Sequence, residues 1–298
     1  MRYDILLKIT YSYKTPVWAG RHLLRFMPLD LPGEQRAIAA NLDVSPAPSE
    51  RSTFRDFFGN QAHEIVFSQA HSQIAFSLKA RIERYARILP DGGGMPLDAL
   101  SGVLEDVHSL APSSPLHFMG RSPRIRPNRH LSDYVEDMLP AEPSVLEAVR
   151  VVGQTLHREM TFDATATSVE TSHEEAFEAR HGVCQDFSHI MIAALRSVGI
   201  PAGYVSGFLR TKPPEGQPRL SGADAMHAWV RAWCGPEIGW FEYDPTNALD
   251  VGEDHVVVAY GRDYSDVSPV KGVLKAATDQ QSRQAVDVIP LEPAGPSP

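Results

Sequence analysis

The sequence predicts an α+β protein, in which an N-terminal β-sandwich precedes a core of helices packed on an antiparallel sheet. Three observations predict this fold class. Residues 1–85 contain several short β-type runs, residues 181–200 have a helical apolar pattern, and residues 226–244 contain two strand patterns. With 298 residues and 43% hydrophobic content, the chain is long enough for two domains with their own cores.

Charge balance and cysteine content limit the classes of partner and compartment. The 28 Lys and Arg residues face 37 Asp and Glu residues, for a net charge of −9 without a basic run, so we expect no nucleic-acid partner. No apolar run approaches the ~18 residues of a membrane span, so we expect no membrane partner. The first residues, MRYDILLKITYSYK, lack the apolar segment of a secretion signal. Two cysteines are too few for a disulfide framework and indicate a reducing, cytoplasmic location. The sequence carries no signal for an oligomeric state.

Residues 1–85 are expected to form the sandwich. Alternation around Ile5 and Leu7 indicates the first strand. Further strand-type runs are separated by turns rich in Pro, Gly and Asn, and they cover residues 22–27, 35–44, 64–68 and 72–85. The stretch from Asp56 to Asn60 is typical of a turn between two strands rather than of a site. Several short strands with regular turn signals predict a β-sandwich.

Residues 86–143 are expected to form an irregular linker with one or two short helices, because prolines and glycines interrupt short apolar pieces. This linker contains a basic cluster, made of Arg121, Arg124, Arg126 and Arg129. Such a cluster is typical of a solvated surface, although it also suits contact with an acidic substrate.

Residues 144–275 are expected to form the second domain. Apolar residues recur at helix spacing from residue 145 to 160, and Ser172 with Glu175 forms a capping-box pattern that opens a short helix. A strand is expected at 202–209. The insertion 211–225 holds three prolines and two glycines and suits a substrate loop. Residues 276–298, which end in PLEPAGPSP, are expected to form a C-terminal tail that includes a disordered part.

A buried helix over residues 181–200 organises this domain. Its apolar residues fall at i, i+4, i+7, i+8, i+11, i+12 and i+15 and define one face; they are Val183, Phe187, Ile190, Met191, Ala194, Leu195 and Val198. Gly199 and Pro201 end the helix. Cys184 therefore lies in the first turn, where unpaired N–H groups and the positive end of the helix dipole favour the nucleophilic thiolate.

Two strands after this helix carry a histidine and an acid. Alternate positions of the first strand share one face, and they are His227, Trp229, Arg231 and Trp233. The second strand, 240–244, ends in Asp244. A register with Trp233 opposite Trp240 places Asp244 opposite Trp229. His227 is then the diagonal neighbour of Asp244, within side-chain reach. A register shifted by one residue would aim the carboxylate away from the histidine.

This constellation meets the requirements of covalent acyl transfer. Cys184 attacks a carbonyl, His227 takes the thiol proton and later protonates the leaving amine, and Asp244 fixes the imidazole tautomer. The backbone N–H of Cys184 is a candidate oxyanion donor, and Gln185 is a candidate second one. Trp229, on the face of His227, either walls the site against water or packs only.

The motifs that carry these residues resemble the transglutaminase-like core of papain-like cysteine enzymes. They are GVCQDFSH around Cys184, HAWVRAW from His227 and GWFEYDPTN through Asp244. The resemblance covers about residues 144–265 and implies these three residues as the triad. The family includes protein cross-linking enzymes, peptidases, amidases and members without catalysis, so the resemblance leaves the reaction open. Where many members carry an acid, this chain has Arg231, which suggests an altered substrate charge preference.

The rest of the chain extends this resemblance to bacterial proteins. The motifs HLLRFMP near Leu24 and DFFGN at Asp56 resemble the β-rich region that precedes this core in bacterial members. The segment AYGRDYSDVSP from Ala259 is similar to the same proteins.

The other reactive side chains have structural interpretations. Cys234 alternates with apolar neighbours and is expected to pack in the core. His189 is expected on the helix surface or as a satisfied polar residue, and Asp186 as a helix cap. Close ligand pairs such as C-x-x-C or H-E-x-x-H are absent from the sequence, and so are D-x-D-x-D-G loops, so we expect no metal and no cofactor.

The sequence therefore predicts thiol-dependent acyl transfer or hydrolysis at an amide, through a Cys-His-Asp triad and a thioester. The expected partner is a peptide or protein substrate that presents a peptide bond, an isopeptide bond or a glutamine side chain. The alternative is a non-catalytic module that holds a peptide or a partner protein in the same cleft.

Overall fold

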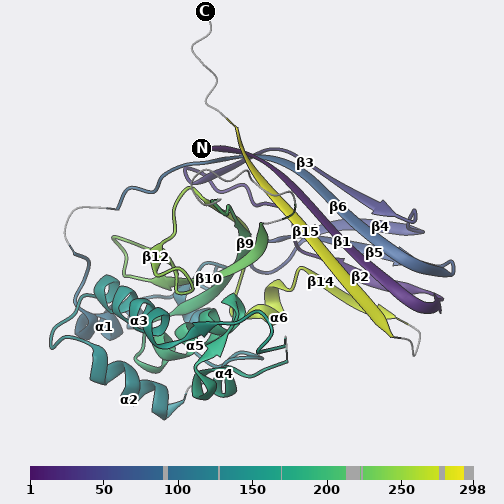
Figure 1. Ribbon diagram of the computed structural model, residues 1–298. Helices are drawn as coiled ribbons and strands as arrows, with labels where there is room; N and C mark the ends of the chain where they lie inside the picture. The colour runs from purple at the N-terminus through teal and green to yellow at the C-terminus, as the bar shows by residue number, and fades with distance from the viewer. Residues whose placement is uncertain are drawn as a thin grey trace, which may run out of the picture.

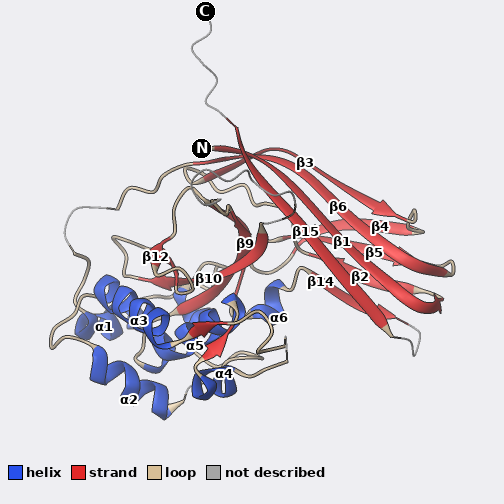
Figure 2. Cartoon of the chain, in the orientation of Figure 1, coloured by secondary structure: helices blue, strands red, loops and turns tan. Residues whose placement is uncertain are grey.

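The computed structural model describes residues 1–89, 93–126, 128–168, 170–212, 222, 224–274 and 279–291 (Figure 1). Most of the insertion predicted as a substrate loop, residues 213–221 and 223, lies outside the described residues, as do 90–92 of the linker and 276–278 and 292–298 of the predicted tail. The helices gather on one side of a central sheet, and a long β-sandwich extends from the other (Figure 2). The α+β class predicted from the sequence is confirmed. None of the described helices is long and apolar enough to cross a membrane.

The sandwich consists of two antiparallel sheets of four strands. The first has the order β15–β1–β6–β3, formed by Gln280–Leu291, Arg2–Val17, His71–Arg84 and Gln35–Ser45. The second has the order β14–β2–β5–β4, formed by Val270–Leu274, Gly20–Leu24, Gln61–Phe67 and Glu50–Arg55. Alternate side chains of β1, among them Ile5 and Leu7, point between the sheets and are buried against Ile65 and Phe76. Burial of this apolar face drives the two sheets together.

The end of the chain corrects the prediction that residues 276–298 form a tail outside the domains. Residues 280–291 form β15, which pairs with β1 from Arg2↔Leu291 to Tyr13↔Gln280. Most of β15 is polar and exposed, and only Val286 and Val288 are buried. Its sequence therefore resembles that of a polar tail. Its pairing partner lies at the other end of the chain, which a local pattern does not reveal. Strands from both ends of the sequence, β1 and β15, therefore lie side by side in one sheet of the sandwich.

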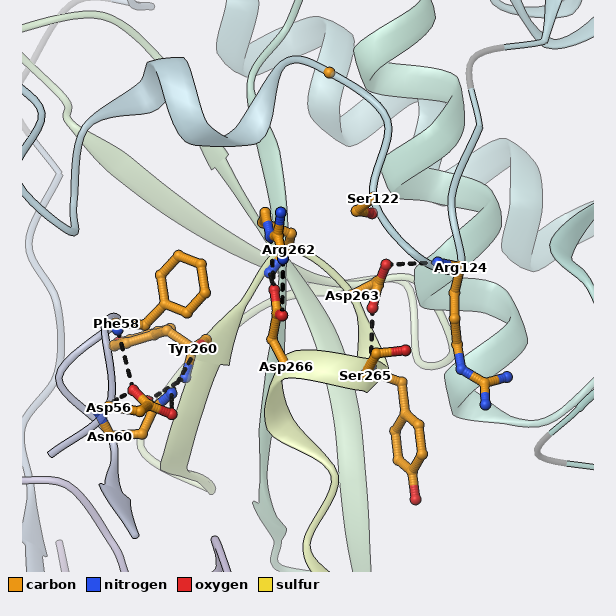
Figure 3. A network of polar contacts seen from close by, with 12 residues as sticks. Asp56, Phe58, Asn60, Ser122, Arg124, Tyr260, Arg262, Asp263, Ser265 and Asp266 are labelled. Carbon is orange, nitrogen blue, oxygen red and sulfur yellow. Dashed lines mark hydrogen bonds and ion pairs between the residues drawn. The ribbon is translucent and has the colours of Figure 1, made fainter. Parts of the chain in front are cut away.

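The middle of the chain contains two 3₁₀ turns and two helices. They are Leu97–Ala99, α1 (Leu100–Glu105), Pro115–Phe118 and α2 (Arg129–Met138). Within the basic cluster, Arg121 and Arg126 are exposed. Arg124 instead anchors the loop: its backbone N–H donates to the carboxylate of Asp263 at 2.7 Å (Figure 3). Its guanidinium lies 5.7 Å from the ring centre of Tyr264.

The core is a five-stranded sheet covered by helices on one face. The strand order is β12–β11–β10–β9–β13, formed by Leu249–Asp250, Trp240–Asp244, Ala225–Trp233, Ala202–Leu209 and His255–Gly261. The remaining elements are α3 (Val145–Glu159), α4 (His173–Ala179), α5 (Cys184–Ser197), α6 (Tyr264–Val267) and the short parallel pair β7 (Thr161–Phe162) and β8 (His181–Gly182). Ala228 and Val230 of β10 belong to the same buried cluster as the apolar face of α5. On the other face, Trp229 and Val257 pack against Leu29 from the sandwich region.

Two buried amide side chains join the sandwich to β13. Gln35 donates to the carbonyls of Leu29 (2.7 Å) and Val257 (2.8 Å), and its Oε1 accepts the N–H of Val257 (2.8 Å). Asn60, at the end of the turn predicted between two strands, bonds to both backbone groups of Tyr260, at 2.7 and 2.8 Å (Figure 3). The two amides act as a substitute for a neighbouring strand along this edge.

His22 lies in the sandwich with neither ring nitrogen hydrogen-bonded within the described part of the chain. Its ring packs edge-on against Phe67 and Phe76, with centroids 5.8 and 5.7 Å apart. Burial, and to a lesser extent repulsion by His71, lower the pKa of His22 to about 4. The folded protein therefore holds this imidazole neutral in weakly acidic solution.

This burial predicts a stability that falls in acid. The unfolded chain protonates His22 below pH ~6.5, whereas the folded chain does so only near pH 4, so the free energy of unfolding should fall as pH drops through this window. In His22→Leu, which has no proton to bind, that fall should be smaller. Urea unfolding at pH 7.5 and pH 5 measures it, with exposed His108→Leu as the control. An equal pH effect in His22→Leu and wild type would contradict the prediction.

Candidate active site

Cys184 is the first residue of α5 and is partly exposed. Oδ2 of Asp186 accepts the N–H of Val183 (2.8 Å) and the hydroxyl of Thr167 (2.6 Å), so the capping role predicted for Asp186 is confirmed. A Cβ at Gly182 would lie 2.6 Å from that carboxylate oxygen, which explains the glycine in front of the cysteine motif. The sequence thus fixes Cys184 at the positive end of a well-capped helix.

The structure settles the register of the two strands, which the sequence left open. Trp233 pairs with Trp240 and Val230 with Tyr243, in the register that brings His227 and Asp244 together. Nε2 of His227 lies 2.8 Å from Oδ2 of Asp244. The His227 imidazole also lies close enough to Cys184 for the cysteine to raise its pKa. Because Nε2 is engaged by the carboxylate, Nδ1 is the nitrogen that remains for the thiol. The structure therefore places His227 against Asp244 and in the neighbourhood of Cys184.

His227 and Asp244 shift each other's pKa strongly. Burial alone would lower the pKa of His227, but its interactions with Asp244 and Cys184 outweigh burial and raise the pKa to about 10. Burial alone would raise the pKa of Asp244, but hydrogen bonds from His227 and His255 hold it well below its usual range. The arrangement favours an imidazolium held against the Asp244 carboxylate.

Two partners of Asp244 escaped the sequence analysis. Nε2 of His255, at the start of β13, lies 3.1 Å from Oδ2 of Asp244, and Nδ2 of Asn247 donates to the same oxygen at 2.7 Å. Asn247 stands in the DPTN motif, only three residues after Asp244, so its proximity was a usable signal. His255 lies on another strand, and a lone histidine at the head of an apolar run gives no local signal.

The predicted pocket residues lie beside the triad. Gln185 follows Cys184 in the first turn of α5 and is 8% exposed. Trp229 is fully buried; its indole N–H donates to Glu242 at 2.8 Å, and its ring centre lies 6.2 Å from that of His227. Trp229 therefore packs and at the same time forms the wall behind the imidazole.

Arg231 lies inside an aromatic cage. Its guanidinium lies 4.6, 4.4 and 4.3 Å from the ring centres of Phe118, Trp240 and Tyr260, and burial lowers its pKa to about 10. It is 6% exposed, so its position gives no support to the interpretation that it selects substrate charge. Cation–π contacts indicate a packing role.

The structural interpretations of His189 and Cys234 are confirmed. His189 is buried rather than on the helix surface, and its Nε2 accepts the N–H of Tyr264 at 3.2 Å. Burial lowers its pKa to about 3, which keeps the ring neutral and able to accept. Cys234 is 1% exposed, and burial raises the pKa of its thiol to about 12. Neither residue is placed to act as nucleophile or base.

Within the described residues, one group could supply three metal ligands. It consists of His227, Asp244 and His255, whose ligand atoms lie within 4.8 Å of one another. Both histidines, however, lie 2.8 and 3.1 Å from one carboxylate oxygen, which are hydrogen-bond lengths. A tetrahedral zinc site, with bonds of about 2.0–2.2 Å, would hold its ligand atoms roughly 3.3 Å apart. The geometry favours a hydrogen-bonded cluster over a metal site.

Comparison with known proteins identifies the family of this chain. Residues 132–245 match the transglutaminase-like superfamily, and residues 3–83 match the bacterial transglutaminase-like N-terminal region. An uncharacterized protein of Mycobacterium tuberculosis is 32% identical over 306 aligned residues, which cover 95% of this chain and 88% of the relative. The chain belongs to the transglutaminase-like superfamily.

Other matches to this transglutaminase-like protein concern part of its length or its fold. An uncharacterized protein of Mycobacterium leprae is 38% identical over 135 residues, 45% of this chain and 47% of that protein. The crystal structure of a candidate cysteine protease from Cytophaga hutchinsonii superposes with a TM-score of 0.75 at 19% identity, over 99% of this chain and 92% of that one. At that identity the likeness shows a shared fold, sandwich included.

Proposed function

We propose that this transglutaminase-like protein catalyses thiol-dependent acyl transfer or hydrolysis at an amide, with Cys184, His227 and Asp244 as its triad. The observation that carries the proposal is the position of His227, whose Nε2 lies 2.8 Å from Oδ2 of Asp244 and whose pKa is raised in part by the neighbouring Cys184. The substrate class is a peptide bond, an isopeptide bond or a glutamine side chain in a peptide or protein.

The first half-reaction forms the thioester. The Cys184 thiolate attacks the amide carbonyl carbon, a C–S bond forms, and the carbonyl electrons move onto oxygen. Cys184 is the first residue of α5, so its backbone N–H can stabilise this oxyanion, with Gln185 as the candidate second donor. The imidazolium of His227 gives its proton to the leaving amine as the C–N bond breaks.

The second half-reaction releases the acyl group. Neutral His227 removes a proton from water or from an acceptor amine, whose lone pair attacks the thioester carbonyl. The C–S bond breaks, and the thiolate and imidazolium return to their starting state. Asp244 remains a carboxylate throughout and stabilises the imidazolium. Water yields hydrolysis, and an amine yields transfer.

The proposal predicts a pH profile for alkylation of Cys184 by iodoacetamide. In a Cys234→Ala background, the midpoint of the rate increase should lie well below pH ~8.5, where ordinary cysteine thiols ionise. His227→Ala removes the neighbouring positive charge, so the midpoint should rise toward that value. Mass spectrometry of the labelled peptide measures both rates. An ordinary midpoint that His227→Ala leaves unchanged would instead support a non-catalytic binding module.

A further inference from the structure

His255 contacts the carboxylate of the proposed triad from a third strand. It is the first residue of β13, is 3% exposed, and its Nε2 lies 3.1 Å from Oδ2 of Asp244. That oxygen is the one bonded to His227, at 2.8 Å. The two histidine rings therefore meet at a single carboxylate oxygen, with centroids 6.2 Å apart.

We infer that His255 is a positioning residue, which fixes the Asp244 carboxylate and through it the orientation of His227. The inference rests on the proposed function, because it assigns His255 a role in the same triad. His255 does not contact the reacting atoms. It acts on a residue that contacts the imidazole.

Apart from His227 and His255, the residues that hydrogen-bond to Asp244 belong to its own turn. Oδ1 accepts the N–H groups of Thr246 (2.9 Å) and Asn247 (3.2 Å), and Oδ2 accepts Nδ2 of Asn247 (2.7 Å). These donors follow Asp244 directly in the chain and move with it. Among the described residues, His255 is the one donor from another element apart from His227 itself. A carboxylate held from both sides keeps one rotamer.

The surroundings of His255 allow it to donate without competing for the proton of His227. Its ring packs edge-on against Trp229, with centroids 5.1 Å apart and planes at 77°. Its Nδ1 is buried and has no partner among the described residues. A second N–H there would be an orphaned donor, which costs more than an unused lone pair. The geometry therefore assigns a proton of His255 to Nε2, from which it donates to Asp244.

Two substitutions separate donation from packing. His255→Phe keeps an aromatic ring against Trp229 but has no donor, and His255→Gln keeps an N–H near the position of Nε2. Both are made in the Cys234→Ala background, and the readout is the pH profile of Cys184 alkylation by iodoacetamide. In His255→Phe the freed carboxylate no longer holds the imidazolium against the thiol. The midpoint should then rise by about one pH unit, a tenfold change in the ionisation equilibrium. His255→Gln should restore the wild-type midpoint.

The outcomes distinguish this inference from the proposed function. A low wild-type midpoint that His255→Phe leaves unchanged would overturn the positioning role alone, and so would equal shifts in both variants, since packing would then be the cause. An ordinary wild-type midpoint would overturn the proposed function and this inference with it.

A measurement on the unaltered chain covers the case in which His255→Phe fails to fold. In protein labelled with ¹⁵N-histidine, the long-range proton–nitrogen spectrum identifies the tautomer of each ring. His255 should carry a proton on Nε2, with Nε2 coupled to a low-field proton. An Nδ1–H form would leave no proton for the bond to Asp244 and would overturn the inference.

Discussion

Replacing Cys184 with Ala is expected to lower kcat/KM for an amide substrate by ~10,000-fold or more, because no other group in the site can form the thioester. Residual turnover would come only from substrate binding and the oxyanion donors. A suitable assay incubates the protein with glutamine-containing peptides and hydroxylamine. Hydroxamate formation reports transfer, and ammonia without hydroxamate reports hydrolysis of the side-chain amide. New peptide termini in the same digest report peptide-bond cleavage.

The second cysteine of the chain provides the matched control. Cys234 is buried, and burial raises its thiol pKa to about 12, so it carries no thiolate at neutral pH. Cys234→Ala should therefore retain wild-type turnover while Cys184→Ala loses it. Full turnover by Cys184→Ala, or an equal loss in the two variants, would show that the proposed nucleophile is wrong.

The part of the site carried by local patterns could be predicted from the sequence. Helical spacing and the glycine before Cys184 placed the thiol at a helix start. Because strand side chains alternate with a period of two, contact between His227 and Asp244 depended only on the register of their two strands. The structure pairs Trp233 with Trp240, which is the register that allows this contact. These features depend on neighbours within a few residues, where spacing and geometry are closely linked.

The features that escaped prediction depend on contacts between distant parts of the chain. The fully exposed strand β4 has no apolar alternation, and β15 pairs with β1 across almost the whole sequence, so neither has a local signal. His255 meets Asp244 only because β13 lies across β9 from β10. The same holds for Arg231: its charge suggested an altered substrate charge preference, but three aromatic rings from separate elements enclose it.

Gln35→Leu is expected to lower the free energy of unfolding by about 3–5 kcal/mol. The substitution leaves the N–H of Val257 and the carbonyl of Leu29 buried without their partner, and each orphaned group costs about 1–3 kcal/mol. The lost bond to the Val257 carbonyl adds less, since that oxygen also accepts the N–H of Leu29 at 3.1 Å. Against a typical total of 5–15 kcal/mol, this loss is a large fraction. Urea unfolding followed by tryptophan fluorescence measures it.

The same substitution tests whether the sandwich supports the site as well as the fold. Val257 lies two residues after His255 on β13, so loosening this strand should release the Asp244 carboxylate before the protein unfolds. The pH midpoint of Cys184 alkylation should then shift in urea concentrations at which fluorescence still reports a folded chain. Gln73→Leu, which removes an exposed amide from β6, should change neither readout. If both variants unfold at the same urea concentration, the hydrogen bonds between the Gln35 amide and β13 do not hold the two parts together. The sandwich then does not stabilise the triad through this strand.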